Sequence, residues 1–199
     1  MKIIPPQSLL EAYAQGIFPM AQSRDDEGVD WYTAPKRGII PLSEFRVSKN
    51  VARIIRNRHF EVRIDTCFRE VMEGCAERES TWINDIILNS YTILHQHGFA
   101  HSVEVFKDER LVGGLYGVAL GGAFFGESMF KRAPEADKVA LYWCHQVLVQ
   151  NGFTLWDTQF YTDHLGRFGA KEINQVEYKE LLEDALGREC VFGLGGDTI

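Results

Sequence analysis

Residues 101–130 read HSVEVFKDERLVGGLYGVALGGAFFGESMF, and this stretch decides the fold class of the chain. In HSVEVF, residues 101–106, polar and apolar side chains alternate, as they do in a strand with one buried face. KDER and the pair Gly121-Gly122 have the composition of hairpin turns and separate largely apolar runs. The stretch therefore predicts an antiparallel meander of three strands.

The segments on either side of the meander predict further strands and helices. Strands are expected at FEVRID, residues 60–65, and at FTLWDTQ, residues 153–159. Residues 31–42 are expected to be extended or loop. Helices are expected in segments with helical periodicity and end signals, from about Ser8 to Gly16, after Ser48 or Asn50, over 67–78, 83–97 and 135–150, and from Asn174 to about Leu186.

The order of these elements predicts an α+β fold. The meander strands are expected at the centre of a mixed sheet, with helices flanking it. We expect residues 1–46 to form a small N-terminal lobe and residues 47–199 to form the larger domain. The chain has 199 residues, 45% of them hydrophobic, so it is long enough to bury a core of this size.

The composition argues against several classes of protein. No run of eighteen apolar residues is present, so no membrane span is expected, and the N-terminal apolar run is too short and too interrupted by prolines for a signal peptide. The cysteines show no CxxC motif, which predicts reduced thiols and neither a zinc site nor disulfides. We therefore expect a cytoplasmic protein.

A basic segment stands out against the net charge of −7. Residues 46–63 carry six basic side chains and one acid. Four of the basic residues are three or four positions apart and so share one helical face: Arg46, Lys49, Arg53 and Arg56. Such a stripe on an acidic protein is the pattern expected of contacts to nucleic-acid phosphates. The alternative is a solvated helix face.

The stretch LWDTQFYTDH, residues 155–164, places polar residues at the end of an apolar strand. Asp157 and Gln159 are two positions apart, so on a regular strand their side chains point to the same side. A buried carboxylate is unfavourable unless it is paired. The two residues therefore form either a hydrogen-bonded structural contact or part of a functional site. Asp163 and His164 are adjacent and so rarely face one another, and we do not expect a catalytic acid–base pair there.

Five segments together resemble the leucyl/phenylalanyl-tRNA–protein transferases. They are GIFPM (16–20), TWI (81–83), HSVEVF (101–106), GGLYGVALGGAFFGESMF (113–130) and WDTQFYTDH (156–164), in the order found in the family. The similarity extends from about Leu9 to Leu186. The order of elements also resembles the GCN5-related N-acetyltransferase fold, in which the sheet opens beside its fourth strand and the acyl donor lies in the gap.

The resemblance implies a reaction with two substrates. The donor is aminoacyl-tRNA charged with leucine or phenylalanine, with methionine as a third candidate. The acceptor is the α-amino group of a protein with an N-terminal arginine or lysine, and the added residue marks the product for degradation. Neither a metal nor a soluble cofactor is implied.

The resemblance also implies catalytic roles. Asp157 and Gln159 match the catalytic pair of the family, in which Asp157 orients the Gln159 amide and Gln159 holds the incoming amine. A neutral amide is a poor base, so positioning is the credible role for Gln159. Glu127 is expected to bind the terminal adenosine or the ester end of the donor. For each residue the structural alternative is a paired core side chain.

Further residues of the chain match the family's binding positions. Leu115, Phe124 and Met129 are expected to line an apolar pocket for the transferred side chain, although apolar residues on central strands are usually plain core. Trp31, Tyr32 and Trp82 are expected to stack on the terminal adenine. Tyr32 is a departure, since the family usually has tryptophan there.

Two other functions remain open at this point. An acyl-CoA-dependent N-acyltransferase needs a glycine-rich loop that cradles the pyrophosphate, but the matching segment FKRAPEADKVAL, residues 130–141, has no glycine. A non-catalytic module that binds basic N-termini needs no intact catalytic pair, whereas this chain retains Asp157, Gln159 and Glu127. We therefore favour the aminoacyl transfer reaction.

Overall fold

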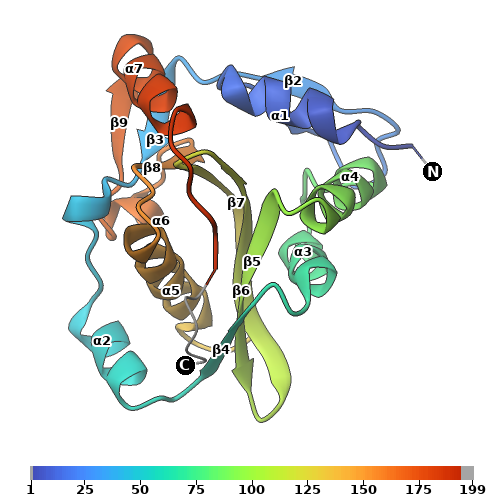
Figure 1. Ribbon diagram of the computed structural model, residues 1–199. Coiled ribbons are helices and arrows are strands. Elements are labelled where there is room, and N and C mark those ends of the chain that lie inside the picture. Colours follow the sequence, from blue (N-terminus) through green and yellow to red (C-terminus); the bar gives the residue numbers. More distant parts are fainter. Residues whose placement is uncertain (1, 194–199) are drawn as a thin grey trace.

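The computed structural model describes residues 2–193, which form a seven-stranded mixed sheet with helices on both faces and a separate two-stranded sheet (Figure 1). The order of the large sheet is β4-β5-β6-β7-β8-β3-β9. Its strands are β3 (Lys36–Ile39), β4 (Glu61–Ile64), β5 (Ala100–Lys107), β6 (Arg110–Leu120), β7 (Ala123–Lys131), β8 (Leu155–Gln159) and β9 (Lys171–Asn174), and the small sheet contains β1 (Phe18–Met20) and β2 (Asp30–Tyr32). The helices are α1 (Pro6–Ala14), α2 (Lys49–Arg56), α3 (Phe68–Ala76), α4 (Asp85–Gln96), α5 (Ala136–Gln150), α6 (Asp163–Gly166) and α7 (Gln175–Leu186).

The predicted α+β class and the meander are confirmed. β5, β6 and β7 pair antiparallel along nearly their whole length and lie second, third and fourth in the sheet. The turn between β5 and β6 places Asp108 and Glu109 at positive φ, and Gly121 does so in the next turn. Tight turns between twisted strands require residues at positive φ. This requirement explains the turn-forming residues seen in the sequence.

Two strands of the large sheet were not predicted as strands. β3 lies between β8 and β9 and pairs antiparallel with both. Both β3 and β9 are short and have charged residues at their starts, so neither shows a clear alternating pattern. β3 belongs to the segment expected to form the N-terminal lobe, and the boundary at residue 46 stays a prediction. Residues 194–199 of the expected larger domain lie outside the described part.

The sheet opens between β7 and β8. These two strands run parallel and pair only from Ala123 to Phe125 on β7 and from Leu155 to Asp157 on β8. Beyond Phe125, β7 continues for six residues without β8 as a neighbour. The expected opening beside the fourth strand is therefore present.

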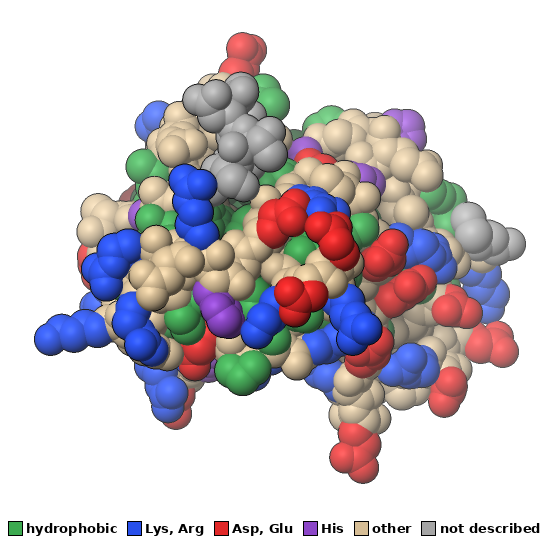
Figure 2. Space-filling model, turned by 90° about the horizontal axis from the view of Figure 1, so that it is seen from below, with side chains coloured by type: hydrophobic (Ala, Val, Ile, Leu, Met, Phe, Trp, Pro, Cys, Tyr) green, Lys and Arg blue, Asp and Glu red, His purple; other side chains and the backbone are tan. Residues whose placement is uncertain are grey.

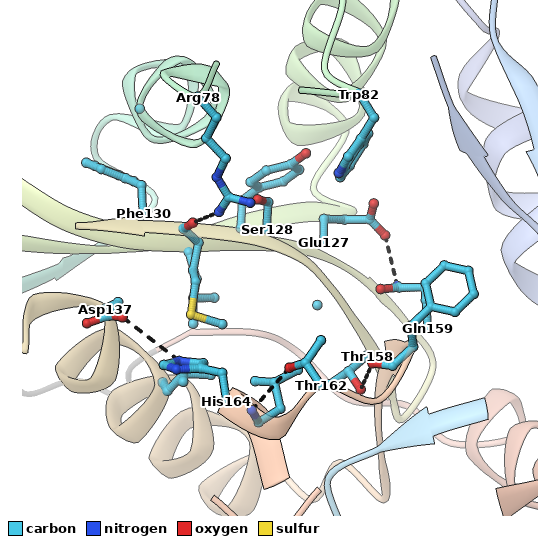
Figure 3. Close-up of a pocket in the computed structure, with 18 of the residues that line it drawn as sticks. Arg78, Trp82, Glu127, Ser128, Phe130, Asp137, Thr158, Gln159, Thr162 and His164 are labelled. Carbon is cyan, nitrogen blue, oxygen red and sulfur yellow. Dashed lines mark hydrogen bonds and ion pairs between the residues drawn. The ribbon is translucent and has the colours of Figure 1, made fainter. Parts of the chain in front are cut away.

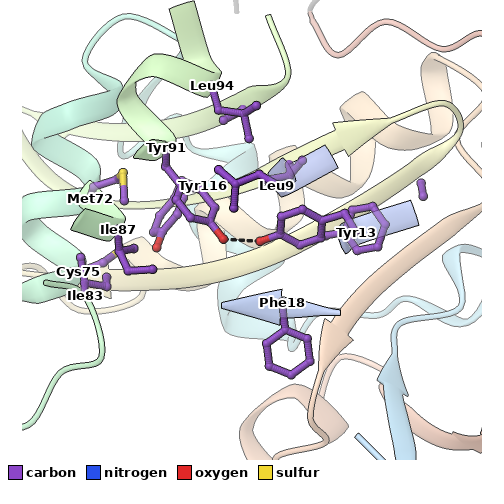
Figure 4. Close-up of a cluster of buried hydrophobic side chains, with 14 of the residues drawn as sticks. Leu9, Tyr13, Phe18, Met72, Cys75, Ile83, Ile87, Tyr91, Leu94 and Tyr116 are labelled. Atoms are coloured by element: carbon purple, nitrogen blue, oxygen red, sulfur yellow. Dashed lines mark hydrogen bonds between the residues drawn. The ribbon is translucent and has the colours of Figure 1, made fainter. Parts of the chain in front are cut away.

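The core has one layer on each face of the sheet. On one face α4 presents Ile87, Tyr91 and Leu94, whose spacing of three and four residues forms a single buried stripe (Figure 4). The helix begins where the Asn84 side chain accepts the Ile87 backbone N–H at 2.9 Å. On the other face α5 packs across β5, β6 and β7. None of the helices within residues 2–193 is long and apolar enough to cross a membrane.

Candidate active site

A cavity of about 590 Å³ occupies the opening between β7 and β8. Figure 3 shows Trp82, Glu127 and Gln159 at one end and Asp137 and His164 at the other. The wall between them contains apolar side chains from β6, β7, α5, β8 and α6: Leu115, Met129, Leu141, Trp156 and Leu165. A concave, mainly apolar cavity with a few polar groups is the usual form of a binding site for a small organic group.

Glu127 is directed into this cavity by an irregularity in β7. Tyr116 pairs with Ser128 and Gly117 pairs with Gly126, so Glu127 is an extra residue in the strand. A bulge of this kind bends the strand and re-aims one side chain, and bulges are frequent beside active sites. The register therefore accounts for an acid that faces a cavity from an otherwise apolar strand.

The carboxyl group of Glu127 accepts hydrogen bonds from two buried polar side chains. The Tyr13 hydroxyl donates to Oε1 at 2.6 Å, and the Gln159 amide Nε2 donates to the same oxygen at 3.2 Å. The Tyr13 hydroxyl also contacts the hydroxyl of Tyr91. Burial raises the pKa of Glu127 to about 8 and outweighs the hydrogen bond from Tyr13. The group is therefore mostly uncharged at neutral pH and can also donate a hydrogen bond to a ligand.

Gln159 reaches Glu127 because its backbone is turned out of the strand. It has a φ of 56°, a left-handed conformation that is uncommon for residues other than glycine. The backbone N–H of Gln159 donates to Oδ1 of Asp157 at 2.8 Å, which holds this turn. Opposite, Gly38 has no room for a Cβ, which would lie 2.5 Å from the carbonyl carbon of Phe160.

Asp157 does not face the cavity, so the expected common face for Asp157 and Gln159 is not observed. Its carboxylate accepts Arg37 Nε at 2.9 Å and Nη2 at 2.8 Å, and the Tyr178 hydroxyl at 2.6 Å. Asp157 and Arg37 are both completely buried. Asp157 and Gln159 do not share a face because the left-handed conformation of Gln159 interrupts the alternation of side chains along the strand.

Arg37 is a site-supporting residue that sequence reasoning missed. Its Nη1 donates to the Gly16 carbonyl at 2.8 Å, and its guanidinium lies over the rings of Phe18 and Tyr178. The residue lies 120 positions from Asp157 in a segment expected to be extended or loop. The available signal was the buried aspartate, since such a carboxylate requires a cation somewhere in the fold.

The expected adenine-stacking residues lie in different surroundings. Trp82 lines the cavity, near Glu127. Trp31 lies on β2, is 45% exposed and does not line the cavity. Tyr32 is partly buried, and its ring stacks on Phe18, which lines the cavity. Phe18 is thus an aromatic wall residue that the sequence did not single out.

Of the three residues expected to form the pocket for the transferred side chain, two line the cavity and one does not. Leu115 and Met129 are direct neighbours across β6 and β7, and both line the cavity. Phe124 is completely buried in the core against Phe192, with ring centroids 5.0 Å apart, and does not line the cavity. Phe124 pairs with Trp156 where β7 and β8 are still in contact, so no opening exists at its position.

The basic stripe lies on and just before α2. Ser48 caps the helix by accepting the Val51 backbone N–H at 3.3 Å, and Val51 is the buried anchor of the helix. The four predicted side chains are exposed and form no ion pair among the described residues: Arg46, Lys49, Arg53 and Arg56. Figure 2 shows lysine and arginine side chains gathered on the side of the molecule where α2 lies in Figure 1.

A mixed sheet that opens beside its fourth strand, with an acid and an amide at one end of the resulting cavity, is the arrangement expected of an acyltransferase-like fold. A crystal structure of FemX superposes with a TM-score of 0.56 and 13% identity over 88% of this chain and 70% of that chain, which supports the fold alone.

Comparison with sequence families is more specific. Residues 39–183 match the leucyl/phenylalanyl-tRNA protein transferase family, and residues 4–35 match the N-terminal domain of the same family. Two proteins named leucyl/phenylalanyl-tRNA–protein transferase are similar to the chain. That of Rhodopseudomonas palustris (strain TIE-1) is 52% identical over 95% of this chain and 86% of the relative. That of Paramagnetospirillum magneticum (strain ATCC 700264 / AMB-1) is 48% identical over 96% of this chain and 94% of the relative. The chain belongs to this family, which is a family of aminoacyltransferases.

Proposed function

We propose that the protein transfers leucine or phenylalanine from aminoacyl-tRNA to the α-amino group of proteins with an N-terminal arginine or lysine. Methionine is a third candidate donor. The observation that carries the proposal is the Gln159 amide held against Glu127 at one end of a mainly apolar cavity, in a chain of this family. The reaction takes place in the cytoplasm, where charged tRNA is available, and it marks the product for degradation.

The chemistry is the aminolysis of an activated ester. The nitrogen of the neutral acceptor amine forms a bond with the ester carbonyl carbon and gives up one proton. The bond from that carbon to the ribose oxygen breaks, and the ribose oxygen takes up a proton. Gln159 Nε2 is engaged by Glu127, so the amide oxygen of Gln159 remains available to accept a hydrogen bond from the incoming amine. This contact orients the amine toward the ester.

Glu127 binds the donor end in this scheme. Because its pKa is raised to about 8, it carries a proton at neutral pH and can donate a hydrogen bond to an oxygen of the ester or of the terminal ribose. Asp157 acts as a positioning residue: it holds the backbone of Gln159 while Arg37 balances its charge. No step requires a metal or a soluble cofactor.

The remaining walls bind the other parts of the donor. The transferred side chain lies against Leu115 and Met129, and the terminal adenine stacks on Trp82, with Trp31 and Tyr32 extending the aromatic surface around β2. Stacking of a base on an aromatic ring contributes roughly 1–3 kcal/mol. The exposed basic residues of α2 contact tRNA phosphates, which supply most of the affinity in nucleic-acid complexes.

The proposal is tested with separately charged, radiolabelled leucyl-, phenylalanyl- and methionyl-tRNA and a series of peptides that differ only in residue one. Label is expected in peptides that begin with arginine or lysine, and a Gln159→Ala variant is expected to transfer far less. Transfer from acyl-coenzyme A, with none from charged tRNA, would support the N-acyltransferase alternative. Binding of basic peptides without any transfer would indicate the non-catalytic module.

A further inference from the structure

The end of the cavity opposite Glu127 holds a polar cluster that the proposed reaction does not use. It consists of Lys131, Asp137 and His164. Figure 3 labels Asp137 and His164. Oδ2 of Asp137 lies 3.6 Å from Lys131 Nζ and 3.9 Å from His164 Nε2. Oδ1 of Asp137 accepts no hydrogen bond from the described residues, although the side chain is only 8% exposed.

A buried carboxylate oxygen without a donor is unfavourable, and in folded proteins such an oxygen nearly always has a partner. Asp137 lies in the first turn of α5, where a carboxylate interacts favourably with the helix dipole. That interaction accounts for an acid at this position, but the protein encloses Oδ1 so fully that a ligand cannot reach it. Oδ2 has only the contacts to Lys131 and His164, and both are longer than a hydrogen bond. A ligand that fills the cavity can therefore donate a hydrogen bond to Oδ2.

The cavity leads from the reaction end to this cluster along an apolar wall. On β7, Met129 lies midway between Glu127 and Lys131, and four strand residues span roughly 13 Å. Leu115 faces Met129 across the strands, and Leu141 lies one helical turn after Asp137. An aromatic side chain that is attached to the donor ester near Glu127 therefore points its tip toward Asp137.

The charges around Asp137 favour a neutral donor over a second cation. Lys131 already supplies a counter-charge for the carboxylate at Oδ2. Burial lowers the pKa of His164, so its ring is mostly neutral at neutral pH. The protein also uses the contact between a phenol and a carboxylate elsewhere, at 2.6 Å from Tyr178 to Asp157.

We propose that Asp137 determines donor specificity at the end of the side-chain pocket by accepting a hydrogen bond from the tip of the transferred side chain. The ligand class is an aminoacyl group with an apolar side chain that ends in a hydroxyl or an N–H, such as the phenol of tyrosine. This inference rests on the proposed transfer function and extends the range of donors beyond purely apolar side chains.

The test compares tyrosyl-tRNA and phenylalanyl-tRNA as donors to one peptide with N-terminal arginine, because these donors differ in the aminoacyl group by a single hydroxyl. The wild-type protein is expected to transfer both. In Asp137→Ala the ratio of tyrosine to phenylalanine transfer is expected to fall about 10-fold or more, because the phenol then has no acceptor. Asp163→Asn is the control, since this exposed acid does not line the cavity, and its ratio is expected to match the wild type.

An unchanged ratio in Asp137→Ala, or wild-type transfer of phenylalanine without tyrosine, would overturn the inference and leave the proposed function intact. Absence of transfer from leucyl-, phenylalanyl- and tyrosyl-tRNA would overturn both. Asp137→Asn keeps the volume of the side chain with a weaker acceptor and is expected to give an intermediate ratio. This variant tests the inference independently if the alanine variant does not fold.

Discussion

Arg37 and Asp157 form an ion pair from which water is completely excluded, with both side chains 0% exposed and two guanidinium nitrogens within 3.0 Å of the carboxylate. The pair joins β3 to the end of β8, and Asp157 also holds the backbone of Gln159. It thereby connects the N-terminal part of the chain to Gln159, which lines the cavity. In the proposed mechanism, Asp157 acts on the reaction through the position of Gln159.

Removal of one partner of this pair is expected to destabilise the fold. In Asp157→Ala the buried guanidinium of Arg37 has no counter-charge, so the free energy of unfolding is expected to fall by roughly 3–5 kcal/mol. Chemical denaturation followed by circular dichroism measures the change. Asp163→Ala, which removes an exposed acid, is the control and should change stability by only about 0.5 kcal/mol or less. An equally small change in Asp157→Ala would contradict the role of the pair.

Glu127 predicts a pH dependence of stability. Its pKa rises from 4.5 in the unfolded chain to about 8 in the folded protein, so the folded state binds the extra proton. The resulting stabilisation is complete below pH 4.5 and is lost as pH rises toward 8. Glu127→Gln cannot titrate, so the stability of the wild type relative to this variant is expected to fall between pH 5 and about 8.5.

The comparison with Glu127→Gln removes contributions from other groups. Burial also raises the pKa of Glu104, to about 7, but this group is present in both proteins and cancels in the difference. The measurement is urea denaturation of both proteins at a series of pH values. A difference that stays constant with pH, or grows in favour of the wild type, would mean that Glu127 is ionised in the folded protein.

Leu115 predicts a shift in donor preference. Leu115→Phe places a larger side chain in the cavity wall, so transfer of phenylalanine is expected to fall relative to leucine and methionine. The change in discrimination corresponds to roughly 1–3 kcal/mol. Transfer rates from the three charged tRNAs measure it, with Val118→Leu on the same strand as a buried control outside the cavity. Equal losses for all three donors in a folded variant would assign Leu115 to the core alone.

The basic residues of α2 predict a salt dependence of donor binding. The double variant Arg53→Glu, Arg56→Glu is expected to bind charged tRNA more weakly. The slope of log affinity against log salt should flatten by about 0.7–0.9 for each lost phosphate contact. Lys179→Glu with Arg188→Glu makes the same change in net charge on another surface and serves as the control. Identical slopes in both double variants would exclude a specific role for α2.

Local sequence patterns predicted the parts of the fold that depend on neighbouring residues. The meander, the main helices and the cap at Asn174, which accepts the backbone N–H groups of Val176 and Glu177, follow from periodicity and end signals. β3 and β9 did not follow, because KRGI and KEIN lack the alternation that β4, a strand of the same length, shows within FEVRID. Their places in the sheet depend on pairing with segments far away in the chain.

Part of the candidate site was also predicted from the sequence. Trp82, Leu115, Glu127, Met129 and Gln159 do meet around one cavity. The sequence did not reveal that a bulge directs Glu127 into it, or that a left-handed Gln159 turns away from Asp157. It also missed the partners Arg37 and Tyr13. An arginine in a segment expected to be extended or loop, and a tyrosine in an amphipathic helix, carry no local sign of their contacts.

The central claim is that Gln159 acts on the acceptor amine while the donor is bound mainly by other residues. Single-turnover transfer and equilibrium binding of aminoacyl-tRNA, measured on the same preparation of Gln159→Ala, test it directly. The rate is expected to fall by about 100-fold or more, because the amine loses its orientation, while the Kd of the donor stays within about threefold of the wild type. A Kd that weakens in step with the rate, or a rate close to that of the wild type, would contradict the claim.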